Sequence, residues 1–262
     1  MKKLHFDYYM QITYSNNVEK CHYTIKCIPV NTDRQHIEQM NIELVPENSF
    51  SKGEDSFGNR MIYGSIEEPH RQFVFHIDGT AVAGIKDAES IEKESTLGMY
   101  RYPYGLTVPG EELSAYYRSL KPEEGISAYE AGTAMMHRLY QDFTYEKNVT
   151  DVNTTAEEAW KLGRGVCQDY AHILIALCRM AGIPARYVAG MLIGEGYSHA
   201  WVEILSENKW YALDPTNNLI VTDSHIKIAT GRDASDCMLN RGLIIGGGSQ
   251  TQEIRVSVEE II

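Results

Sequence analysis

The stretch that decides the fold of this chain reads GRGVCQDYAH and occupies residues 163–172. Two glycines precede Cys167, and the apolar residues after it recur with the spacing of one helix face: Leu174, Leu177, Cys178 and Ala181. Gly182 then supplies a stop signal. The pattern predicts a buried helix whose first turn carries Cys167. Free backbone N–H groups and the positive end of the helix dipole favour a thiolate at that position.

Two segments further along the chain are rich in strand-forming residues. They read SHAWVEIL at residues 198–205 and KWYALD at residues 209–214, and only three residues separate them. Such a short connection between two strand patterns predicts a β-hairpin.

The hairpin brings a histidine and an aspartate together. A tight turn that pairs Leu205 with Asn208 places His199 directly opposite Asp214, with Cβ atoms within about 5.5 Å. A cysteine at a helix start, with a histidine and an aspartate on neighbouring strands, forms a set of nucleophile, base and orienting carboxylate. The candidate catalytic residues are therefore Cys167, His199 and Asp214.

Three motifs around these residues resemble the core motifs of the transglutaminase-like superfamily: GVCQDYAH at 165–172, SHAWVE at 198–203 and LDPTN at 213–217. Within that superfamily, the chain is most similar to the bacterial transglutaminase-like cysteine proteases. The sequence DSFGN at 55–59 is similar to part of the N-terminal domain of these bacterial proteins. His225 and GRD at 231–233 resemble their C-terminal segment.

The resemblance implies an α+β fold with a papain-like transglutaminase core, in which the helix carrying the cysteine packs on an antiparallel sheet. It also implies that Cys167, His199 and Asp214 are the catalytic triad. The backbone N–H of Cys167 is, by analogy, one donor of the oxyanion hole. The second donor stays open among the remaining candidates: Gln168, Trp160 and Tyr145.

The first third of the chain has the pattern of β-structure. Apolar residues alternate with mostly polar ones at Leu4, Phe6, Tyr8, Met10, Ile12 and Tyr14, and similar short alternations follow. We predict an all-β sandwich domain over residues 1–86. A turn-rich connector with a short helix over 111–120 follows at 87–126. The catalytic domain with a C-terminal extension then spans 127–262.

The composition narrows the classes of partner. A formal net charge of −12 argues against nucleic acid, whose phosphates need a basic face. No cysteine and histidine spacing typical of zinc accompanies the triad, so we expect no metal and no cofactor. No run of about 18 apolar residues is present, so we expect no membrane segment. Five scattered cysteines without a leader-like N-terminus suggest a cytoplasmic protein. The oligomeric state stays open.

The expected reaction is cysteine-dependent acyl transfer on the amide bonds of a peptide or protein, through a thioester. Water as the acceptor makes the enzyme a peptidase or amidase, and a lysine amine makes it a transglutaminase. Nothing in the sequence indicates a channel for an amine, so hydrolysis is preferred. A non-catalytic binding module on the same fold is the remaining alternative.

Overall fold

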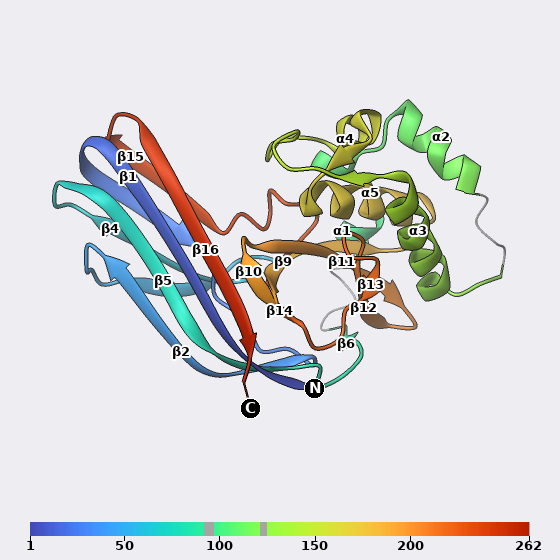
Figure 1. The fold of residues 1–262 in the computed structure, drawn as a ribbon, viewed down its shortest axis with the longest axis horizontal. Helices are drawn as coiled ribbons and strands as arrows, with labels where there is room; N and C mark the ends of the chain where they lie inside the picture. The colour runs from blue at the N-terminus through green and yellow to red at the C-terminus, as the bar shows by residue number, and fades with distance from the viewer. Residues whose placement is uncertain (92–96, 121–124, 262) are drawn as a thin grey trace.

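The computed structural model of the protein describes residues 1–91, 97–120 and 125–261. Two β-sheets lie next to each other, and helices cover one face of the second (Figure 1). The predicted connector at 87–126 lies partly outside the described residues. Its described part holds, in order, β6 (Glu89–Ser90), α1 (Gly98–Arg101), the 3-10 turn η2 (Gly105–Thr107) and α2 (Glu111–Leu120). The short helix predicted over 111–120 is therefore present.

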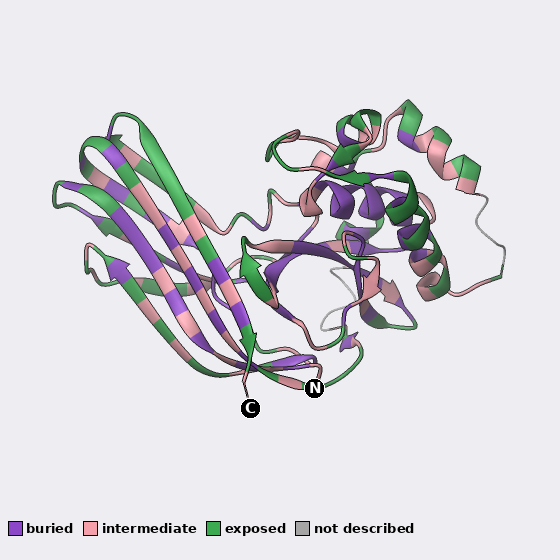
Figure 2. Ribbon diagram, in the orientation of Figure 1, coloured by how far each residue is buried: buried purple, intermediate pink, exposed green. Residues whose placement is uncertain are grey.

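The N-terminal β-rich region predicted from the sequence is confirmed, and one long strand organises it. From Leu4 to Met10 in β1 (Lys2–Ile25), every second side chain is buried, and buried and less buried positions alternate along the strand (Figure 2). The strands on one side of β1 are β2 (Gln35–Val45), β3 (Ser51–Glu54), β4 (Arg60–Ile66) and β5 (His70–Ala83). The first half of β1 pairs with β5 and its second half pairs with β4. Because β1 continues through both halves, the described strands form one continuous curved sheet, whereas the predicted sandwich has two.

The other edge of β1 is occupied by strands from the far end of the sequence. These strands are β15 (Asn240–Gly246) and β16 (Gln250–Glu260), and both run antiparallel to β1. Between them the backbone turns through three glycines with positive φ angles of 90°, 86° and 66°, a conformation that favours glycine. Residues 240–260, predicted from the sequence to extend the catalytic domain, thus complete the N-terminal sheet.

The second region is centred on α5 (Cys167–Met180), whose residues from Asp169 to Arg179 are all buried. Below it lies a sheet of described strands in the order β13-β12-β11-β9-β14, with β6 paired to β12 (Figure 1). These strands are β9 (Ala185–Leu192), β11 (His199–Ser206), β12 (Lys209–Asp214), β13 (Leu219–Ile220) and β14 (His225–Gly231).

Helices α3 (Ala128–Asp142) and α4 (Ala156–Leu162) pack against α5. A capping box begins each of them, from Ser127 to Glu130 in α3 and from Thr155 to Glu158 in α4. Two short strands, β7 (Thr144–Tyr145) and β8 (Arg164–Gly165), pair in parallel just before α5.

Side-chain amides of the N-terminal region cover the β14 edge of the sheet that lies under α5. Gln35 accepts from the N–H of Lys227 at 2.7 Å and donates to its carbonyl at 2.8 Å. Asn59 makes the same double contact with Thr230, at 2.7 and 2.8 Å. Each amide thus satisfies a donor and an acceptor that a neighbouring strand would otherwise satisfy. Asn59 belongs to the DSFGN motif, which therefore joins the two regions.

Of the helices that the structure describes, none has the length and the apolar character needed to cross a membrane.

Candidate active site

Cys167 is the first residue of α5, as the sequence predicts. The helix is preceded by Gly163, which has a left-handed φ of 69°, and by Gly165, which pairs with Tyr145 of β7. A Cβ on Gly165 would lie 2.3 Å from a carboxylate oxygen of Asp169, so only glycine fits there. The chain therefore turns sharply into the helix and presents Cys167, which is partly exposed, at its open N-terminal end.

The carboxylate of Asp169 fixes the backbone at this turn. It accepts from the N–H of Val166 at 2.7 Å and from the hydroxyl of Thr150 at 2.7 Å. Burial raises the pKa of Asp169 above its usual value, although these hydrogen bonds act in the opposite direction. Asp169 thus ties the start of α5 to the loop before α4.

The histidine and aspartate predicted to be catalytic do meet, but the predicted hairpin register is wrong by two residues. The strands pair Ser206 with Lys209, and the two turn residues between them both have positive φ angles, 50° and 61°. Because a shift of two residues keeps every side chain on its own face of the sheet, His199 and Asp214 remain on the same face and meet diagonally. His199 Nε2 lies 2.8 Å from Asp214 Oδ2.

Asp214 is fully buried and its carboxylate accepts from several donors. Oδ2 accepts from His199 at 2.8 Å, from the side chain of Asn217 at 2.8 Å and from Nε2 of His225 at 3.0 Å. Oδ1 accepts from the backbone N–H groups of Thr216 at 3.0 Å and Asn217 at 3.2 Å. Burial by itself raises the pKa of Asp214, but the donors outweigh it and hold the pKa well below the usual range. The group is therefore a carboxylate.

The imidazole of His199 is held between this carboxylate and the thiol. Burial lowers its pKa, but hydrogen bonds with Asp214 and with Cys167 outweigh burial and raise the pKa to about 10. With Nε2 bonded to Asp214, Nδ1 is the ring nitrogen left for the thiol. The structure thus brings together all three residues that the sequence singled out.

His225 was missed as a site residue by reasoning from the sequence. The resemblance drew attention to it, but no spacing rule connects β14 with Asp214, because strand β9 lies between β14 and the hairpin strand β11. Asn217 was missed as well. Its place in the motif LDPTN, three residues after the aspartate, was the available signal.

The three side chains proposed as the second oxyanion donor differ in their contacts and in their exposure. The Gln168 amide donates to the carbonyls of Asp151 at 3.4 Å and Val152 at 3.3 Å, so it faces that loop. Trp160 stacks on Tyr116 with ring centroids 3.9 Å apart. Tyr145 is exposed, and the partial burial of its phenol and the nearby Cys167 both raise its pKa. Of the three side chains, Tyr145 is the one whose pKa is raised by the Cys167 thiol.

Three groups in the site offer metal-ligand atoms within 4.8 Å of one another: His199, Asp214 and His225. Both imidazole Nε2 atoms are hydrogen-bonded to one carboxylate oxygen, which requires a proton on each of them. A metal would need these protons removed, so the arrangement fits a hydrogen-bonded network better than a ligand set.

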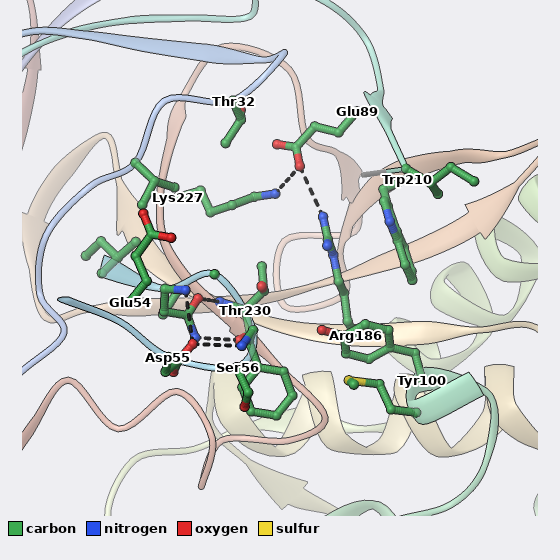
Figure 3. A pocket seen from close by; sticks show the side chains of 18 of the residues that line it. Thr32, Glu54, Asp55, Ser56, Glu89, Tyr100, Arg186, Trp210, Lys227 and Thr230 are labelled. Atoms are coloured by element: carbon green, nitrogen blue, oxygen red, sulfur yellow. Dashed lines mark hydrogen bonds and ion pairs between the residues drawn. The ribbon is translucent and has the colours of Figure 1, made fainter. Parts of the chain in front are cut away.

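A polar pocket of about 430 Å³ lies between the two regions, and the described residues that line it include none of the predicted catalytic ones (Figure 3). Beside this pocket, two cations pair with two buried carboxylates. The Lys227 ammonium lies 2.5 Å from Glu89 and 2.6 Å from Glu203. Arg186 pairs with the same two carboxylates at 3.1 and 2.7 Å, and it stacks 4.3 Å above Trp210. These four charged side chains, the ion quartet, join segment 89–90 to the sheet under α5.

Comparison with known proteins agrees with this architecture. Residues 119–215 match the Transglutaminase-like superfamily, and residues 4–82 match the Bacterial transglutaminase-like N-terminal region. The two matched regions together span most of the chain, which thus has a transglutaminase-like core and a bacterial transglutaminase-like N-terminal region.

Similar sequences occur in mycobacteria. An uncharacterized protein of Mycobacterium tuberculosis (strain ATCC 25618 / H37Rv) is 27% identical over 266 residues, which covers 89% of this chain and 84% of that protein. An uncharacterized protein of Mycobacterium leprae (strain TN) is 34% identical over 127 residues, 45% of each chain.

A solved structure shares the whole fold. The crystal structure of a "Putative Cysteine Protease" from Cytophaga hutchinsonii superimposes with a TM-score of 0.80 and 22% identity, over 100% of this chain and 92% of that chain. The predicted α+β fold, with a transglutaminase-like core after an N-terminal β-rich region, is thereby confirmed.

Proposed function

We propose that this protein is a cysteine-dependent enzyme that transfers the acyl group of an amide bond in a peptide or protein substrate. The observation that carries the proposal is the position of Cys167 at the start of α5, beside an imidazole that Asp214 orients at 2.8 Å. The match to the Transglutaminase-like superfamily supports the same chemistry. The name of the Cytophaga hutchinsonii protein supports a proteolytic form of it.

In the first half of the reaction, the Cys167 thiolate attacks the carbonyl carbon and a carbon–sulfur bond forms. The oxyanion is stabilised by the backbone N–H of Cys167, at the open end of α5, and Tyr145 is our candidate for the second donor. The carbon–nitrogen bond then breaks, and the His199 imidazolium gives its proton to the leaving amine. A thioester and a neutral imidazole remain.

In the second half, His199 takes a proton from the incoming acceptor while that acceptor attacks the thioester. The acyl group leaves, and Cys167 returns to the thiolate beside an imidazolium. Asp214 keeps the ring in one orientation and stabilises its cation through both halves. We propose water as the natural acceptor, so that the products are a carboxylic acid and an amine.

We also propose that the enzyme works in the cytoplasm. All five cysteines lie in the described part of the chain and are free thiols, which suits a reducing compartment.

The test is to incubate the full chain with a peptide library, with and without a fluorescent primary amine, and to identify the products by mass spectrometry. We expect hydrolysed peptides from the native protein and none from Cys167→Ala. Cys178→Ala is the matched control, because it removes a buried thiol from the same helix. Products that carry the amine in preference to hydrolysed ones would make the protein a transglutaminase. Activity retained in Cys167→Ala would overturn the mechanism.

A further inference from the structure

His225 is a buried histidine that the proposed mechanism does not use. It is the first residue of β14, and only 4% of its surface is exposed. Its Nε2 lies 3.0 Å from the same oxygen of Asp214 that His199 approaches at 2.8 Å. One carboxylate oxygen therefore lies between two imidazole rings.

The hydrogen bonds define the protonation of the His225 ring. A carboxylate oxygen can only accept, so Nε2 of His225 carries a proton and donates it. The other nitrogen, Nδ1, lies 3.0 Å from the hydroxyl of Ser224, which can donate to it. Burial lowers the pKa of His225, and the charges of His199 and Arg34 act in the same direction against the pull of Asp214. The ring is thus a neutral donor.

We propose that His225 is a positioning residue that sets how strongly Asp214 holds the His199 imidazolium. This rests on the His199–Asp214 pair of the proposed function. Asp214 does not need His225 to keep its place, because Asn217 and two backbone N–H groups also hold the carboxylate. What His225 changes is the charge that Oδ2 presents, since each donor on an oxygen weakens its attraction for the next.

A weaker hold of Asp214 on the His199 imidazolium suits the proton transfer that the proposed reaction needs. An imidazolium held too strongly is a poor acid, and His199 has to give its proton to the leaving amine. By sharing Oδ2, His225 leaves the imidazolium stable enough to pair with the thiolate and acidic enough to react.

The other charged groups near His225 come from several elements. Arg34 of the N-terminal region donates to the carbonyl of Val221, and the ion-quartet members Lys227 and Glu203 border the same small cavity as His225. The rings of Trp201 and His225 meet in an edge-to-face arrangement with centroids 5.1 Å apart. The charges of Lys227 and Glu203 neutralise each other at 2.6 Å, so Asp214, His199 and Arg34 dominate the field at this ring.

The experiment measures the rate of Cys167 alkylation by iodoacetamide against pH, in the full chain. At high pH the alkylation rate should rise a second time, because the imidazolium loses its proton and the thiolate becomes more reactive. We call this second rise the upper limb of the profile. His225→Leu removes the donor, and we expect the upper limb to move to higher pH by about one unit. His225→Gln keeps an N–H near the position of Nε2 and should leave the limb close to that of the native protein.

The matched control is His172→Gln, which alters another fully buried histidine that bonds to the backbone of Ala234 and not to Asp214. It should leave the limb unchanged. An unmoved or lowered limb in His225→Leu would overturn the proposal, as would equal shifts in all three variants.

If His225→Leu does not fold, nitrogen-15 NMR of the native protein decides. We expect a protonated Nε2 and an unprotonated Nδ1 on His225, and the reverse tautomer would refute the proposal. A native thiol with a single ordinary step in its alkylation profile would instead count against the proposed function, and the NMR result would still decide the role of His225.

Discussion

Replacing Asp214 by asparagine should disable the site through the tautomer of His199. The asparagine has one oxygen and one NH₂ group for two positions that both accept hydrogen bonds in the native protein. At the Oδ1 position the donors are two backbone N–H groups, which cannot change. At the Oδ2 position two of the donors are imidazoles, which can move their protons from one nitrogen to the other.

The magnitudes decide how the asparagine orients. Turning NH₂ toward the backbone would leave buried N–H groups unpaired, at about 1–3 kcal/mol each. Turning it toward the rings costs less, because each ring can present an unprotonated Nε2. His199 then carries its proton on Nδ1, facing Cys167, and cannot act as a base. We expect about a 10⁴-fold loss of turnover and a loss of about 2 kcal/mol in the free energy of unfolding, from weakened charge-assisted bonds.

The assay pairs iodoacetamide alkylation at pH 6 with urea unfolding of the same samples. The native thiol should react readily at pH 6, and the thiol of Asp214→Asn should react slowly. Asp233→Asn is the matched control, because Asp233 is also fully buried and accepts from backbone groups but bonds to no imidazole. Asp233→Asn should lose stability and keep its thiol reactivity. Native-like alkylation in a folded Asp214→Asn protein would refute the tautomer argument.

Three further predictions concern stability. The pKa of His199 in the folded protein is raised to about 10. The stabilisation that its imidazolium adds to the free energy of unfolding is therefore fully present below about pH 6.5 and is lost as the pH rises toward 10. The loss is at most about 1.4 kcal/mol per pH unit. Urea unfolding of native protein and His199→Ala should converge over that interval, and a constant difference would contradict it. Lys227→Met leaves Glu89 and Glu203 with one cation, and we expect the free energy of unfolding in urea to fall by about 3–5 kcal/mol. Lys209→Met, at an exposed lysine, is the control. An equally small loss in both variants would argue against a stabilising role for the ion quartet. Asn59→Leu removes both contacts to β14 and should speed amide hydrogen exchange at Thr230, while unchanged exchange would show that the strand edge needs no cover.

The core of the fold was readable from the sequence because its signals are local. The glycines before Cys167 and the apolar helical stripe after it lie in the same short stretch of sequence as the helix that they predict. The alternation from Leu4 onward is equally local, and all of these patterns predicted the elements that the structure contains.

The features that could not be predicted from the sequence depend on contacts between segments that lie far apart in the chain. The hairpin register was off by two residues because the choice between turns rests on the left-handed conformation of Glu207 and Asn208. His225 reaches Asp214 only because β9 and β14 assemble beside the hairpin. Residues 240–260 have an ordinary strand pattern, and nothing in that pattern names β1 as their partner.

One pairing has a consequence for how the protein is made. The segment just before His199, β10 (Gly194–Gly196), pairs with residues 256–258 of β16. β16 is synthesised after every residue of the triad, so a nascent chain can contain Cys167, His199 and Asp214 while the loop leading to His199 still has no template. Likewise, one edge of β1 can form its hydrogen bonds only after β15 and β16 have been synthesised. The strand that pairs with the segment before His199 is therefore available only after Cys167, His199 and Asp214 have all been synthesised.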